Sequence, residues 1–100
     1  MTDSTKLTIL DFGAPWCTAC ITIDRMLEKE IMPRWGEHLA LKKVDVHEHP
    51  ELREKYRVLS VPTVVVLSPA GEVLWRRSRV FPWTEMKSIL AQHFPEPSHS

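Results

Sequence analysis

The sequence predicts an α/β domain in which a mixed sheet is covered by helices on both faces. Short apolar runs typical of strands alternate with longer segments of helical periodicity, in the order β-α-β-α-β-β-α. A chain of 100 residues has room for one hydrophobic core. We therefore expect a single domain over residues 1–100, with its core in about residues 7–94 and a flexible tail over 95–100.

The first half of the chain is predicted to form a strand, a helix and a second strand. Leu7–Phe12 is a largely apolar run that suits a strand buried on both faces. Residues 17–31 carry apolar side chains at helical spacing without an internal glycine or proline, which predicts a helix that Pro33 then interrupts. Leu39–Val46 alternates in part and indicates the second strand.

The second half is predicted to form a short helix, a hairpin and a last helix. Pro50 suits the first position of the short helix. Residues 63–67 are the most β-prone run, and the turn at 68–71 leads into a partner strand over 72–80 near the sheet edge. Residues 83–94 are amphipathic and predict the closing helix.

Charge and hydropathy exclude several classes of protein. Thirteen basic and thirteen acidic residues cancel, so no overall field attracts nucleic acid or an anionic membrane. No apolar run is long enough to span a bilayer, and the N-terminus lacks the basic and apolar regions of a signal peptide. These features predict a cytoplasmic protein, or a periplasmic one if a signal or membrane segment was removed.

The two cysteines, Cys17 and Cys20, lie where the first strand gives way to the first helix. Unpaired backbone N–H groups at a helix N-terminus stabilise a thiolate and lower the pKa of a thiol placed there. Cys17 is expected to be the exposed nucleophile. Cys20, one turn further along the same face, can attack a mixed disulfide formed at Cys17. The spacing therefore favours dithiol–disulfide exchange.

A metal site is the main alternative use of this pair. Two cysteines supply half of a zinc shell, and His47 and His49 are available for the rest. The spacing is not a usual finger pattern, and there is no second Cys-x-x-Cys, so we expect no metal.

Four segments resemble the thioredoxin family in order and spacing: Asp11–Cys20, Lys43–Pro50, Tyr56–Thr63 and Gly71–Val73. The resemblance covers about residues 7–94. It implies a thioredoxin fold with a central mixed four-stranded sheet flanked by helices, without the family's extra N-terminal strand and helix. That shortened form, with alanine before the second cysteine, also resembles the thiol-reducing domain of bacterial transmembrane reductases of the DsbD type.

The resemblance assigns catalytic roles to three residues and a supporting role to a fourth. Cys17 and Cys20 match the redox pair. Asp11 matches the buried carboxylate that moves a proton to or from Cys20, and burial without a fixed cationic partner should raise its pKa. Lys43 matches the lysine close to that carboxylate; a solvated strand lysine is the alternative.

The resemblance also implies a substrate-binding surface. Trp16 matches the family's docking tryptophan, and core packing is the alternative for this residue. Pro62 matches the cis-proline facing the disulfide, which leaves the backbone of Val61 free to pair with an extended substrate. Thr63 follows this proline, as in the family.

The implied function is a protein-disulfide reductase that exchanges electrons with protein or small-molecule disulfides. It needs no bound cofactor besides the Cys17–Cys20 pair. The implied electron donor is a thioredoxin-reductase-like protein or another dithiol, and we expect a monomer. A non-catalytic binding module of the same fold, or a Cys/His metal-binding domain, is the alternative.

Some residues depart from the family pattern. Gly13 replaces a usual tryptophan, which we expect to loosen the packing, and Thr18-Ala19 replaces Gly-Pro between the cysteines. Arg79 stands where a glycine borders the substrate groove, and the arginines at 76–79 are expected to form a solvated edge. His47 is expected to be a solvated loop histidine, with a place beside Trp16 as the alternative.

Overall fold

Four strands form the centre of the structure, a computed structural model that describes residues 6–94. The predicted tail over 95–100 lies outside the described residues. In chain order the elements are β1 (Leu7–Gly13), α1 (Thr18–Met26), the π-helical turn η1 (Leu27–Ile31), α2 (Met32–Trp35), the 3-10 turn η2 (Gly36–His38), β2 (Leu39–Asp45), α3 (Pro50–Lys55), β3 (Thr63–Leu67), β4 (Val73–Arg77) and α4 (Trp83–His93).

The predicted mixed sheet is confirmed, with strand order β2-β1-β3-β4. The pair β1–β2 is parallel, whereas β1–β3 and β3–β4 are antiparallel. The two central strands are the most apolar, and every residue of β3 is buried. The β3–β4 hairpin turns at Gly71, whose φ of 91° favours glycine.

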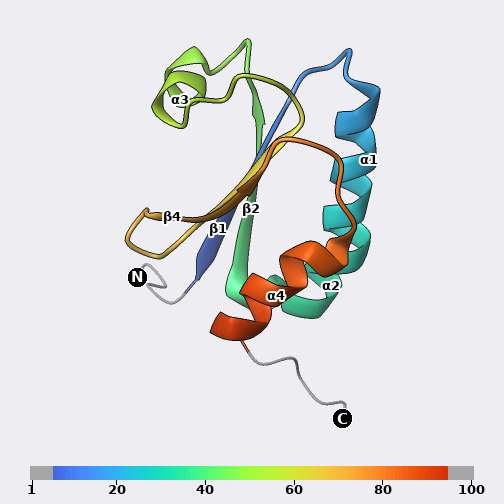
Figure 1. The fold of residues 1–100 in the computed structure, drawn as a ribbon, viewed down its shortest axis with the longest axis vertical. Helices are drawn as coiled ribbons and strands as arrows, with labels where there is room; N and C mark the ends of the chain where they lie inside the picture. The colour runs from blue at the N-terminus through green and yellow to red at the C-terminus, as the bar shows by residue number, and fades with distance from the viewer. Residues whose placement is uncertain (1–5, 95–100) are drawn as a thin grey trace.

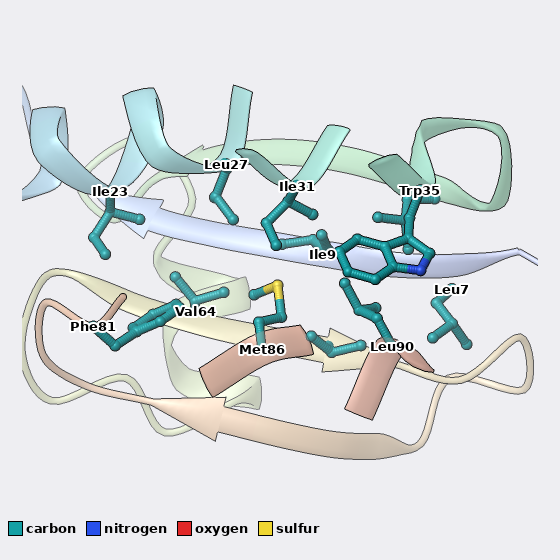
Figure 2. Packing of buried hydrophobic residues seen from close by; sticks show 12 residues of the cluster. Leu7, Ile9, Ile23, Leu27, Ile31, Trp35, Val64, Phe81, Met86 and Leu90 are labelled. Carbon is teal, nitrogen blue, oxygen red and sulfur yellow. The ribbon is translucent and has the colours of Figure 1, made fainter. Parts of the chain in front are cut away.

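Helices α1, α2 and α4 cover one face of the sheet, and α3 lies on the opposite side (Figure 1). Figure 2 shows Ile23, Leu27 and Ile31 pointing from the first helical segment onto β1 and β3. Met86 and Leu90 of α4 belong to the same cluster, and these two side chains and the three of the first helical segment are fully buried. The apolar stripe predicted for residues 17–31 is thus the face that packs on the sheet.

A smaller cluster fills the other face beneath α3. Leu10, Phe12 and Val65 of the central strands pack there against Val58, in the loop that follows α3. Because side chains of a strand alternate between faces, β1 contributes to both clusters. The prediction that β1 is buried on both faces is confirmed, and this anchors the end of β1 from which the cysteine segment starts.

The structure corrects the prediction that Pro33 interrupts the first helix. The helical path continues through η1 and α2 as far as Trp35. The N–H of Met32 bonds to the carbonyl of Leu27, five residues back, which is the wider spacing of a π turn. A widened turn accommodates the proline ring at the start of α2, where its missing N–H costs little. The strand expected over 72–80 is also shorter, since β4 ends at Arg77.

Candidate active site

The cysteine pair is held at the junction between β1 and α1. Cys17 is the N-cap residue of α1, and its Sγ accepts a hydrogen bond of 3.1 Å from the backbone N–H of Cys20. The two cysteines form a disulfide with their Cα atoms 5.2 Å apart. A donor that already points at Cys17 Sγ also stabilises a thiolate there after reduction. The junction therefore presents the pair in its oxidised state and favours the ionised sulfur in the reduced state.

Cys17 is less exposed than the sequence predicted. Only 6% of the residue is accessible, close to the value for Cys20. Its sulfur is tied to Cys20 by the disulfide and by the N-cap hydrogen bond, so the side chain is turned toward the helix. The adjacent Trp16 carries the exposed apolar surface, at 70% accessibility.

Asp11 lies on β1 and is 2% exposed. Neither of its carboxylate oxygens has a hydrogen-bond partner within residues 6–94. Burial, with a smaller contribution from the nearby Asp24 carboxylate, raises the pKa of Asp11 to about 8. The raised pKa predicted for this residue is confirmed, so the carboxyl group can hold or release a proton near neutral pH.

A cleft of about 340 Å³ connects Asp11 with Cys20 and with solvent. Lys43 also lines it and is the parallel neighbour of Asp11 in the β1–β2 register. The ammonium group of Lys43 bonds to Glu28 rather than to Asp11, and this bond raises the pKa of Lys43. Lys43 therefore lies near Asp11, as predicted, but its ammonium group forms an ion pair with Glu28. The charge of Lys43 lowers the pKa of Asp11 by less than burial raises it.

Asp24 is a polar residue of this cleft that the sequence reasoning missed. Its position contained the necessary signal. It follows Cys20 by four residues on one helix, which places both side chains on the same helical face. Asp24 therefore joins Asp11 on the Cys20 side of a cleft that Asp45 and Glu48 also line.

Gly13 lies directly against the second cysteine and lines the same cleft. A Cβ at position 13 would lie 3.3 Å from both Cβ and Sγ of Cys20. Such a distance is tighter than ordinary van der Waals contact, so a side chain at residue 13 would press on Cys20.

The segment before β3 contains the predicted cis peptide bond between Val61 and Pro62. Thr63 is fully buried, and its hydroxyl donates to the carbonyl of Ser60 at 2.7 Å and lies 3.1 Å from Ser78 Oγ. These contacts fix the segment on both sides of the proline. A hollow of about 120 Å³ is lined by Val61 together with Trp16, which brings these two predicted binding residues to one surface.

His47 is an exposed loop residue, as predicted, and it also lies beside Trp16, with ring centroids 6.4 Å apart. Across residues 6–94, no three His, Cys, Asp or Glu side chains gather closely enough to hold a metal ion.

Comparison with known proteins decides the family. The family model described as Thioredoxin matches residues 1–80. The chain belongs to the thioredoxin family. A thioredoxin of Bacillus subtilis is 36% identical over 90 residues, which cover 90% of this chain and 85% of that protein. Thioredoxin-1 of Drosophila melanogaster is 37% identical over 62 residues, or 62% of this chain and 57% of the relative.

Solved structures agree with this membership. Thioredoxin-2, described as a component of malaria parasite protein secretion machinery, superposes with a TM-score of 0.79 at 26% identity, covering 88% of this chain and 84% of the other. A Malassezia sympodialis thioredoxin gives a TM-score of 0.76 at 27% identity, covering 89% and 78%. The thioredoxin fold is confirmed, and with its Cys17–Cys20 pair the protein is a thiol–disulfide oxidoreductase. In the part of the chain that is described, no helix has the length and hydropathy needed to cross a membrane.

Proposed function

We propose that this protein reduces protein disulfides, with Cys17 as the attacking thiolate. In the first step the Cys17 thiolate bonds to one substrate sulfur, and the other substrate sulfur leaves as a thiolate. In the second step Cys20 attacks Cys17 Sγ and releases the substrate's remaining thiol, forming the Cys17–Cys20 disulfide. Two electrons pass from the cysteine pair to the substrate in each cycle.

The observation that carries this proposal is a buried carboxyl group that lines the same cleft as the second cysteine and has no hydrogen-bond partner within residues 6–94. The Cys20 thiol must lose a proton before it can attack. Asp11, with a pKa raised to about 8, has an affinity for protons that is matched to accepting that proton near neutral pH. The positive charge of Lys43, on β2, lowers the pKa of Asp11 and so favours its carboxylate form. The cleft allows the proton to exchange with water afterwards.

The substrate is proposed to dock on the opposite side of the disulfide. Trp16 supplies an exposed apolar surface, and the backbone of Val61 pairs with an extended segment of the substrate. Pro62 turns the chain so that this backbone faces the site. Thr63 acts from within, because its buried hydroxyl holds the segment through the Ser60 carbonyl.

The same proposal covers the electron donor and the setting. Re-reduction needs a dithiol donor of the thioredoxin-reductase kind; the relative from Mycobacterium leprae is named a bifunctional thioredoxin reductase/thioredoxin. The cysteine pair is the only redox group that the mechanism requires. We also propose a monomer that works in the cytoplasm. The balanced charge of the chain gives it no overall attraction to nucleic acid or membranes.

Reduction of insulin disulfides tests the proposal. The wild type should catalyse precipitation of the insulin B chain with dithiothreitol as the electron source, and Cys17→Ser should not. Turnover by Cys17→Ser at the wild-type rate would overturn the catalytic assignment. Stoichiometric zinc that stays with the purified wild type and is lost from Cys17→Ser would favour a metal-binding function instead.

A further inference from the structure

Three arginines, Arg53, Arg57 and Arg76, lie around the loop between α3 and the cis-proline. Arg53 Nε donates to the carbonyl of Val58 at 3.1 Å. Arg76, reaching across from β4, donates to the carbonyls of Tyr56 and Arg57 at 2.8 and 3.3 Å. These bonds end on neutral carbonyls, so they leave the positive charges uncompensated.

No carboxylate within residues 6–94 forms an ion pair with any of these arginines. The other two arginines of the β4 segment behave differently, because Arg77 and Arg79 both pair with Glu85. Glu85 therefore offsets part of the positive charge of Arg77 and Arg79, whereas the arginines around residues 56–58 have no ion-pair partner within residues 6–94. Like charges gathered in this way repel one another, and an anionic partner would remove that cost.

Arg57 occupies a backbone position that favours glycine. Its φ is 53°, in the left-handed region. It follows the C-cap of α3, and the N–H groups of Arg57 and Val58 close the helix by bonding to the carbonyls of Glu54 and Arg53. Glycine would adopt this conformation without strain. Arg57 thus holds an exposed guanidinium group at a backbone position that costs a non-glycine residue some strain.

An apolar path runs from the proposed docking surface to these arginines. The hollow beside Val61 and a second cavity of about 520 Å³ next to α3 share Arg53, Val58 and Leu59 as lining residues. Leu59 is 89% exposed, which is unusual for a large apolar side chain. Glu54 is the single carboxylate that lines either cavity, against the two guanidinium groups of Arg53 and Arg57. The path thus combines apolar surface with net positive charge.

We propose that the substrate is a polypeptide whose disulfide is flanked by apolar and acidic residues, and that this flank lies over Leu59 with its carboxylates beside Arg53 and Arg57. The inference rests on the proposed function, since it extends the same docking site. Apolar contact on Leu59 supplies affinity, and charge complementarity supplies the preference among substrates.

Three peptide disulfides test this preference. Each is the symmetrical disulfide of a peptide with one cysteine, flanked on both sides by a leucine and two Glu, two Gln or two Lys residues. The fully reduced protein is mixed with each peptide, and the single-turnover rate constant is measured by alkylating the remaining thiols. We expect the Glu peptide to react roughly fivefold faster than the Lys peptide, with the Gln peptide between them, and the ratio to shrink in about 0.5 M salt.

Variants locate the preference. Arg57→Gly removes the guanidinium and suits the left-handed backbone, and Arg57→Glu reverses the charge; both should bring the Glu-to-Lys rate ratio to about one or below. Lys29→Glu, an equal charge change on the η1 turn, should keep the wild-type ratio. Equal rates for the three peptides would overturn the inference, as would a ratio that survives in both Arg57 variants or falls equally in Lys29→Glu. Reaction of Cys17→Ser with all three peptides would instead overturn the proposed function.

Discussion

The disulfide of this protein separates two unlike regions. On the inner side, next to Cys20, the cleft holds the buried Asp11 carboxyl group and the Asp24 carboxylate. On the outer side, Trp16 follows directly before Cys17 and shares a hollow with Leu59, and both expose apolar side chains to solvent. The two sulfur atoms are bonded to each other, yet their surroundings differ in polarity, burial and charge.

The two sides of the disulfide fit two different steps of disulfide exchange, substrate docking and proton transfer. A substrate has to dock beside one sulfur, and on that side Trp16 exposes an apolar side chain. The proton has to leave the other sulfur, and that side holds a buried carboxyl group of raised pKa that can take it up. Substitutions on one side of the disulfide at a time can show whether the step on the other side is affected.

The largest expected effect comes from removing the inner sulfur. Cys20→Ser should attack a substrate disulfide once and then remain covalently joined to it, because no thiol is left to release the substrate. Non-reducing gel electrophoresis should show a complex that dithiothreitol dissolves. Cys17→Ser is the matched control and should form no such complex; a complex at Cys20 in that control would contradict the assigned order of attack.

Replacing the buried carboxyl group should slow the step that it serves. Asp11→Asn has a nearly identical shape but cannot accept a proton, so release of the mixed disulfide should slow by about 100-fold at pH 7. The first attack, by Cys17, should change much less. Rapid-mixing measurements separate the two steps, and equal slowing of both would show that Asp11 does not act specifically on Cys20.

The same substitution should change stability in a pH-dependent way. The pKa of Asp11 is about 8 in the folded protein against 3.8 for the unperturbed group. The folded state therefore binds the proton more tightly, and its stabilisation is complete below about pH 4 and lost as the pH rises toward 8. Wild-type stability relative to Asp11→Asn should fall by roughly 3 kcal/mol between about pH 5 and pH 8, as measured by urea unfolding. Parallel pH profiles for the two proteins would contradict the raised pKa.

Truncating the outer surface should affect binding more than chemistry. Trp16→Ala removes an exposed apolar side chain, so KM for a protein substrate should rise by about tenfold with a smaller change in kcat. Val73→Ala, at an exposed position on β4, is the control and should leave both constants near their wild-type values. A fall in kcat alone would place Trp16 in the chemical step rather than in docking.

The smallest expected effect concerns a further carboxylate of the cleft. The Asp24 carboxylate contributes to the raised pKa of Asp11, so Asp24→Asn should lower that pKa and move the pH dependence of the release step to lower pH. Glu37→Gln, on the η2 turn, should leave the profile unchanged. An unchanged profile in Asp24→Asn would mean that burial alone sets the proton affinity of Asp11.

Much of the fold could be predicted because local signals and burial agree. The runs at Leu7–Phe12 and Thr63–Leu67 are strands in the structure, and the apolar stripe of the first helix is its buried face. Pro33 misled the prediction, since a single-sequence rule places the helix end there, whereas the π turn before it lets the helix continue.

Site residues that belong to a sequence motif could be predicted. Features that depend on packing between elements could be predicted less well. The cysteine spacing and the likeness to thioredoxins pointed to Asp11, Trp16 and Pro62. The burial of Cys17 and the use of the Lys43 ammonium by Glu28 depend on contacts between elements, which no local pattern reports. Asp24 was missed although its helical spacing from Cys20 was available.

Direct titration of the Asp11 carboxyl group tests the central claim, that the inner side of the disulfide holds a proton near neutral pH. The carboxyl carbon can be followed by ¹³C NMR across the pH range, with Asp11→Asn used to assign its signal. The account predicts a midpoint of about 8. A midpoint near 4, the ordinary value for an aspartate in water, would contradict it.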